Sequence, residues 1–187
     1  MTRSAVFLAA MSAAFAQDAA IDVARSTITI HVGKAGLLSA AGHEHWVSAP
    51  ISSGTIQEAG TPSVEFTVDT AKMTIKPDPK VDEKTQAQIQ KDMEEMTLET
   101  AKFPQITFHS TRIDKTGEGQ WKVIGDLALH GVTKPVTLEV KRTGDFYAAH
   151  TVLKQTDFAI KPVTVGGGVV KVKNEVDIDF RIFPRTP

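Results

Sequence analysis

The sequence predicts an all-β protein, built from about eight antiparallel strands with one amphipathic helix packed beside them. Two observations carry this prediction. Apolar and polar residues alternate with a period of two along most of the chain, which places successive side chains on opposite faces of a strand. One segment, residues 81–98, instead has its apolar residues at helical spacing. Such strands suit an antiparallel barrel or a sandwich, and we favour the eight-stranded barrel because closure removes all exposed strand edges.

The first sixteen residues have the features of a secretory signal peptide. Arg3 precedes an apolar run over residues 5–15, and the segment ends in Ala-Phe-Ala at residues 14–16, an A-x-A cleavage pattern. The apolar run is shorter than the roughly 18 residues that a membrane-spanning helix needs. We therefore expect that residues 1–16 are removed, that residues 17–187 form one domain without stable membrane insertion, and that the protein is periplasmic or secreted.

The strands follow one another along the mature chain. Apolar residues alternate with polar ones in five short stretches: residues 27–32, 64–68, 106–109, 121–129 and 136–140. The last two stretches are separated by a turn from Gly131 to Pro135, where glycine tolerates a positive φ and proline fixes φ. The clearest strand is C-terminal, at residues 170–182, where charged residues alternate with valine, isoleucine and phenylalanine. Each stretch therefore predicts a strand with one apolar face.

Residues 81–98 predict a helix of about four to five turns. Its apolar stripe is expected to pack against the barrel through Val81, Ile89, Met93 and Met96. Asp82 and Glu83 in the first turn suit the positive end of the helix dipole. Pro104 ends the segment and begins the next strand.

A barrel of eight strands is wide enough to hold one elongated apolar ligand. An outer-membrane barrel is disfavoured, because nine Phe, two Trp and one Tyr are too few for two aromatic girdles. In a water-soluble barrel the apolar faces point inward. We therefore predict that the interior and its ligand contacts are formed by Ile28, Ile30, Phe66, Phe108, Leu127, Leu129, Leu138, Val176, Ile178 and Phe180.

Composition excludes several classes of function. The 21 Lys and Arg residues are balanced by 22 Asp and Glu residues, so general nucleic-acid binding has no electrostatic basis. The chain has no cysteine, which excludes disulfides, thiolate nucleophiles and cysteine-ligated metals. No G-x-S-x-G motif is present. We expect a protein that is not an enzyme and requires no cofactor, and a homodimer is compatible with the sequence.

Two histidines, His43 and His45, are separated by one residue. On an extended strand their side chains project to the same side and could chelate one metal ion, with His109 or His130 as a third ligand. Two imidazoles alone do not make a metal site. The pair could equally hydrogen-bond loop carbonyls at the barrel rim or bind the polar head of a ligand at the barrel mouth. A periplasmic metal-binding or redox-linked protein is thus the alternative function, and a module that binds a protein partner is a third.

Three stretches resemble, in order and spacing, the YceI-like family of bacterial lipocalin-like proteins. They are KFPQITFHST at residues 102–111, VIGDLALHGVTKPVTL at residues 123–138 and TDFAI at residues 156–160. The resemblance extends from about residue 22 to residue 181. It implies a periplasmic or secreted, eight-stranded antiparallel lipocalin-like barrel with a helix at its side. It also implies non-enzymatic binding of a polyisoprenoid lipid, such as an isoprenoid quinone or a prenyl phosphate.

The chain departs from the family pattern at three places. Ala159 stands where the family usually has glycine, and the helix has Gln-Lys-Asp-Met at residues 90–93 instead of the family's Arg-Asp-x-His-Leu pattern. Residues 42–46, Gly-His-Glu-His-Trp, replace a Gly-x-Phe segment. These departures indicate a divergent branch of the family.

Overall fold

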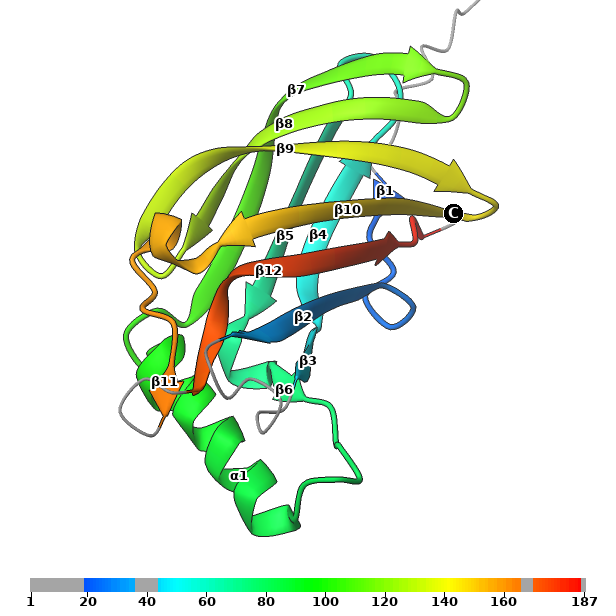
Figure 1. Ribbon diagram of the computed structural model, residues 1–187. Coiled ribbons are helices and arrows are strands. Elements are labelled where there is room, and N and C mark those ends of the chain that lie inside the picture. Colours follow the sequence, from blue (N-terminus) through cyan, green and yellow to red (C-terminus); the bar gives the residue numbers. More distant parts are fainter. Residues whose placement is uncertain (1–18, 36–43, 166–169, 186–187) are drawn as a thin grey trace, which may run out of the picture.

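The computed structural model describes residues 19–35, 44–165 and 170–185. In this part of the chain, twelve antiparallel strands form one curled sheet, and a helix lies at one end of it (Figure 1). The strands are β1 (Ala19–Ala20), β2 (Thr27–Ala35), β3 (His45–Ala49), β4 (Ile51–Gln57), β5 (Ser63–Asp69), β6 (Thr74–Ile75), β7 (Gln105–Gly117), β8 (Gln120–Leu129), β9 (Val132–Thr143), β10 (Phe146–Lys154), β11 (Thr164–Val165) and β12 (Val170–Ile182). The predicted fold class is confirmed. The structure has more strands than predicted, and three of the additional ones, β1, β6 and β11, have only two residues each.

The sheet curls into a barrel because strands β3 and β4, which are adjacent in the sequence, lie near its two opposite ends. Strand β3 pairs with β2, while β4 pairs with β5. Only Pro50 separates β3 from β4, and proline has no N–H to donate to a neighbouring strand. When β3 and β4 are counted as one interrupted strand, eight long strands surround the interior.

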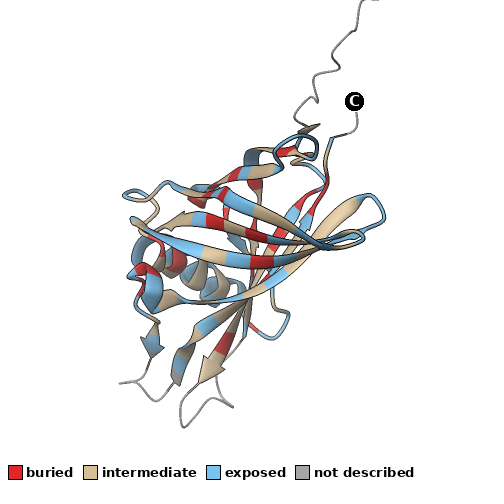
Figure 2. Cartoon of the chain, turned by 90° about the horizontal axis from the view of Figure 1, so that it is seen from above, coloured by how far each residue is buried: buried red, intermediate tan, exposed pale blue. Residues whose placement is uncertain are grey.

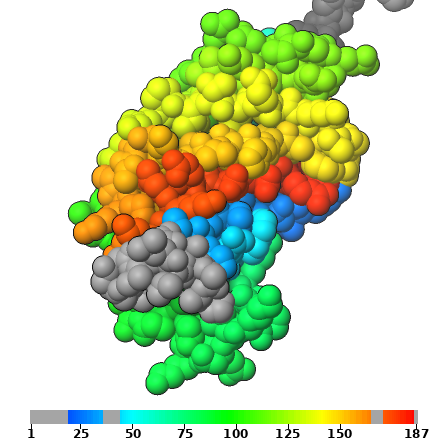
Figure 3. Space-filling view, viewed as in Figure 1, coloured from blue at the N-terminus to red at the C-terminus, as the bar shows by residue number. Residues whose placement is uncertain are grey.

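The first and last long strands of the barrel lie side by side. Strand β12 pairs antiparallel with β2, so that Phe180 lies opposite Ile28 and Ile178 lies opposite Ile30. The space-filling view shows the red surface of β12 against the blue surface of β2 (Figure 3). Asp179 and Arg181, which alternate with these apolar residues on β12, are exposed. Exposed and buried positions alternate along several strands (Figure 2).

The helix differs from the prediction at its C-terminal end. Helix α1 spans Glu83–Asp92 and is followed by a π-helical turn at Met93–Thr97. Asp82 caps it, accepting hydrogen bonds from the Thr85 amide (3.0 Å) and hydroxyl (2.7 Å), which lower the pKa of the Asp82 carboxyl. Met96 is 71% exposed, so its predicted packing against the barrel is wrong. The wider π turn changes the angle between successive residues, and only Met93 of the two methionines stays on the buried face.

The described helices do not include one that is long and apolar enough to cross a membrane.

Candidate ligand-binding site

The barrel encloses an apolar cavity of about 500 Å³ at the end where α1 lies. We call it the helix-side cavity. Ile89 and Met93 of the helical segment close it, and side chains from the barrel strands form its walls. All ten residues predicted to point inward line this cavity: Ile28, Ile30, Phe66, Phe108, Leu127, Leu129, Leu138, Val176, Ile178 and Phe180. The structure therefore brings the predicted residues together around one enclosed space, and their contact with a ligand remains a prediction.

The mouth of the helix-side cavity is basic. The inward row of β2 changes from apolar to charged after Val32, where Lys34 lines the cavity. The inward row of β3 ends in the same way at His45, which lies opposite Val32. Lys154 and Lys171 also line the cavity, and among the described residues Asp92 is its one acidic lining residue. An anionic group at the mouth would therefore find more cationic than anionic side chains around it.

Two of these mouth residues were not anticipated from the sequence. Lys34 continues the alternation of β2, but the sequence interpretation ended the strand at Val32. Lys171 was expected on the outer face; it is exposed and pairs with Ala35, while its neighbour Val172 pairs with the inward-facing Lys34, so Lys171 reaches the cavity only at its rim. The register of β12 against β2 shifts between Val172 and Val176, where three residues of β12 lie opposite one residue of β2. Because the number of extra residues is even, Val172 and Val176 stay on the same face and the alternation is kept.

The four histidines considered as metal ligands are not brought to one place by the described residues. His43 lies outside them. His45 lines the cavity mouth, whereas His109 lies on the outer face with Nδ1 3.5 Å from a Glu65 carboxylate oxygen. Within residues 19–35, 44–165 and 170–185, no group of three or more His, Asp or Glu side chains is arranged to hold a metal ion. The suggestion that His109 or His130 completes a site with His45 thus gains no support.

His130 instead joins three segments at the edge of the helix-side cavity. Its Nε2 lies 2.8 Å from a carboxylate oxygen of Glu99, and its Nδ1 lies 3.2 Å from the carbonyl oxygen of Phe158. Both ring nitrogens thus lie within hydrogen-bond distance of an oxygen atom. The side chain is only 9% exposed. His130 therefore ties the end of the helical segment and the loop around Phe158 to the β8–β9 turn.

The same three segments hold unusual backbone conformations. In the described chain, the non-glycine residues with positive φ are Glu99 (46°), His130 (52°) and Ala159 (57°). A left-handed residue with a Cβ costs roughly 1–2 kcal/mol, and glycine avoids this cost. This explains why glycine suits the position of Ala159. The neighbouring residues Leu98, Leu129, Phe158 and Ile160 line the cavity, so the left-handed residues fix the shape of its edge.

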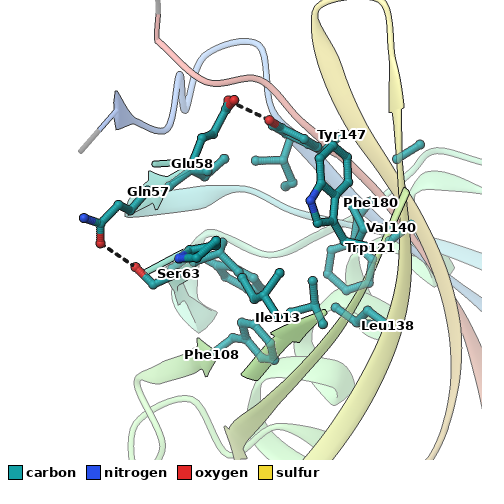
Figure 4. A pocket seen from close by; sticks show the side chains of 18 of the residues that line it. Gln57, Glu58, Ser63, Phe108, Ile113, Trp121, Leu138, Val140, Tyr147 and Phe180 are labelled. Atoms are coloured by element: carbon teal, nitrogen blue, oxygen red, sulfur yellow. Dashed lines mark hydrogen bonds between the residues drawn. The ribbon is translucent and has the colours of Figure 1, made fainter. Parts of the chain in front are cut away.

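A second cavity, of about 370 Å³, lies in the other half of the barrel (Figure 4). We call it the far-side cavity. Trp121 and Tyr147 line it, with their rings in an edge-on arrangement 5.5 Å apart. At its mouth the Tyr147 hydroxyl donates a 2.6 Å hydrogen bond to Glu58, and Arg142 donates to both Tyr147 (3.2 Å) and Glu58 (3.4 Å). These contacts link the β4–β5 turn to strands β9 and β10 across the mouth.

The pKa of Tyr147 is expected to reflect its burial and its hydrogen bonds at the mouth of the far-side cavity. Burial, which is the largest cause, and the hydrogen bond to Glu58 together raise the pKa of the Tyr147 hydroxyl to about 12. Because the folded state holds this proton more tightly than the unfolded state, its stabilising effect is present below pH 10 and is lost as the pH rises to about 12. Ultraviolet absorbance measures the titration directly, since Tyr147 is the chain's only tyrosine.

The Glu58→Gln variant is the control for this titration. It should lower the pKa of Tyr147 but leave it above the ordinary value, because burial is the largest cause of the shift. Titration of the folded wild-type protein near pH 10 would contradict the arrangement at the mouth.

The fold and its cavities define the protein as an antiparallel β-barrel that encloses apolar space. The family model described as the YceI-like domain matches residues 20–183. The chain therefore belongs to the YceI-like family.

Curated relatives match a short part of the chain. A 47-residue segment is 64% identical to a UPF0312 protein of Yersinia pestis (strain Pestoides F) and 60% identical to one of Yersinia enterocolitica. This segment covers 25% of the chain and 24% of each relative, so the match spans about a quarter of the length of these relatives.

Two solved structures share the fold over most of the chain. BcnA of Burkholderia cenocepacia has a TM-score of 0.59 at 20% sequence identity, with 88% of this chain and 99% of that chain covered. A polyisoprenoid-binding domain from Saccharophagus degradans, implicated in plant cell wall breakdown, has a TM-score of 0.63 at 17% identity, with 91% and 100% covered. At these identities the similarity establishes the fold.

Proposed function

We propose that this protein is a non-enzymatic carrier that binds the chain of a polyisoprenoid lipid in the helix-side cavity. The observation that carries the proposal is the convergence of all ten inward apolar residues on this one cavity. Burial of each CH₂ group contributes about 0.8 kcal/mol, so several isoprene units give tight binding without a charged contact. The polyisoprenoid-binding domain from Saccharophagus degradans, which shares the fold, supports the same ligand class.

The basic mouth favours a prenyl phosphate over an isoprenoid quinone. Lys34 and His45 end the inward rows of adjacent strands, where the head of a lipid would emerge from the cavity. Lys154 and Lys171 add two further ammonium groups at the mouth. Phosphate oxygens accept strong hydrogen bonds from such cationic donors, whereas quinone carbonyls are neutral acceptors. A metal-dependent or redox-linked function using His43 and His45 is not favoured by any contact among the described residues.

The test is mass spectrometry of the organic extract from natively purified protein. We expect a polyisoprenoid lipid at near one molecule per chain. A clean extract, together with failure of the emptied protein to bind added geranylgeranyl phosphate or geranylgeraniol, would overturn the proposed function.

The Lys34→Glu variant tests the head group separately. It should weaken the binding of geranylgeranyl phosphate by roughly tenfold, because it replaces a charge-assisted hydrogen bond with repulsion. Binding of geranylgeraniol, which has no charge, should change little. Lys141→Glu is the matched control, since Lys141 is exposed on β9 and lines neither cavity. Isothermal titration calorimetry measures the affinity of each of the two variants for each of the two ligands. If Lys34→Glu weakens the binding of the alcohol and of the phosphate equally, an anionic head group is contradicted.

We further propose that the carrier acts outside the cytoplasm. The charged start, short apolar run and A-x-A ending of residues 1–16 support cleavage after Ala16. Cell fractionation followed by N-terminal sequencing should recover a mature chain that begins at Gln17 from the periplasm or medium. Recovery of a cytosolic chain that keeps its original N-terminus would contradict export.

A further inference from the structure

An aromatic wall separates the two cavities of the barrel. Phe66, Phe108, Phe180 and Leu138 line both cavities. The rings of Phe66 and Phe108 are stacked with centroids 5.3 Å apart, and the ring of Phe180 lies 6.3 Å from that of Phe66. Phe66 and Phe108 are 8% and 3% exposed, so they fill the space between the cavities.

Gly125 holds the wall in place. A Cβ atom at this position would lie 2.4 Å from Cζ and 2.7 Å from Cε2 of Phe108. The ring therefore occupies the space that any other side chain at residue 125 would need. This close packing of the Phe108 ring against Gly125 restricts rotation of the ring and keeps the two cavities apart.

The two cavities have different chemistry. Apart from the shared wall, the helix-side cavity is lined mainly by aliphatic side chains, which suit a flexible hydrocarbon chain. In the far-side cavity, Trp121 and Tyr147 stand opposite the short segment that carries Gln57 and Glu58 (Figure 4). Together with the wall, their rings surround the cavity with aromatic faces and edges. Such rings prefer offset-stacked or edge-on aromatic neighbours.

We propose that the far-side cavity is a second binding site, for a planar aromatic molecule of one or two fused rings that carries a hydroxyl group. Its volume of about 370 Å³ lies at the small end of the range for ligand sites. At the mouth, Glu58 already accepts a hydrogen bond from a phenolic hydroxyl, that of Tyr147, and a carboxylate can accept further donors. Lys115 lines the same cavity and offers a donor to the ligand's oxygen. Binding here is independent of occupancy in the helix-side cavity.

Fluorescence of Trp121 measures this binding directly, with 2-naphthol as the probe. The chain's other tryptophan, Trp46, is 44% exposed and stacks on His31 with ring centroids 4.4 Å apart. It does not line either cavity. In a Trp46→Phe background the emission of Trp121 should therefore change saturably with 2-naphthol. Absence of a saturable change would overturn the proposal.

Two substitutions on one strand separate the sites. Ala149 and Thr151 are both on β10, but Ala149 lines only the far-side cavity and Thr151 lines only the helix-side cavity. Ala149→Phe should fill the far-side cavity and weaken 2-naphthol by roughly tenfold, while geranylgeraniol binds as before. Thr151→Phe should have the opposite pattern. If either variant lacks a cooperative thermal transition and therefore does not fold, the smaller leucine is introduced at that position instead of phenylalanine.

The outcomes distinguish this proposal from the proposed function. Saturating geranylgeraniol should leave the 2-naphthol affinity within about twofold, a difference smaller than one ordinary hydrogen bond. Displacement of 2-naphthol by the lipid, or unchanged 2-naphthol binding in the folded Ala149 variant, would overturn a separate site. If geranylgeraniol does not bind the wild-type protein at all, the lipid-carrier function fails, whereas the aromatic site is still decided by Trp121 and the Ala149 variants.

Discussion

The Leu138→Glu variant is expected to lose its cooperative unfolding transition and its lipid binding. Leu138 is 7% exposed and lines both cavities, so a carboxylate there would be buried among mainly apolar side chains. Losing the burial of leucine and desolvating the new polar group cost about 5 kcal/mol together. Proteins of this kind have a total stability of about 5–15 kcal/mol, so the expected loss removes a large part or all of it. Urea denaturation followed by circular dichroism measures the effect.

Thr137→Glu provides the matched control for this prediction. Thr137 is the preceding residue of β9 and is exposed on the outer face. The same new charge should there change the free energy of unfolding by no more than about 0.5 kcal/mol. Equal effects of the two substitutions would show that the faces of β9 have been assigned wrongly.

The Gly125→Ala variant is expected to be destabilised by about 3 kcal/mol, which is large for the addition of one methyl group. The new Cβ would lie 2.4 Å from the ring of Phe108 and 2.6 Å from the carbonyl oxygen of His109. The ring can tilt only into the packed wall, and the carbonyl belongs to the paired backbone of β7. Chemical denaturation gives the change in the free energy of unfolding.

Gly117→Ala tests whether this loss comes from the crowded site or simply from the change of glycine to alanine. A Cβ at Gly117 would find its nearest contact at 3.6 Å, from the Gln120 side chain. This variant should stay within about 0.5 kcal/mol of the wild type. A comparable loss in both variants would show that the loss comes from replacing glycine by alanine and not from crowding against Phe108.

The sequence predicted the barrel and its inward residues because both depend on a local pattern. A period of two assigns each residue to one face, and the assignment held for residues on six different strands, from Ile28 of β2 to Phe180 of β12. The helical pattern failed where the local geometry changes. The π turn that follows α1 exposed Met96, which helical spacing had placed on the apolar stripe.

The divided interior could not be predicted, because it depends on how side chains from different strands meet. Nothing in the local sequence relates Gly125 to the ring of Phe108, although β7 and β8 place them together. The contacts of His130 with Glu99 and Phe158 likewise join segments that lie about 30 residues apart in the chain. Family resemblance marked Ala159 as unusual, but the left-handed backbone that explains it is visible only in the structure.

The pairing of β2 with β12 has a consequence for how the chain acquires its fold. One edge of β2 can pair with β3, the next strand along the chain, but its other edge must wait for β12, at the far end of the chain. Contacts between such distant residues form slowly. Until then the edge of β2 and the inward faces of its neighbours stay open to other chains, which is a hazard for aggregation. Productive folding of this barrel therefore depends on keeping an almost complete but unclosed sheet apart from its copies until the last strand arrives.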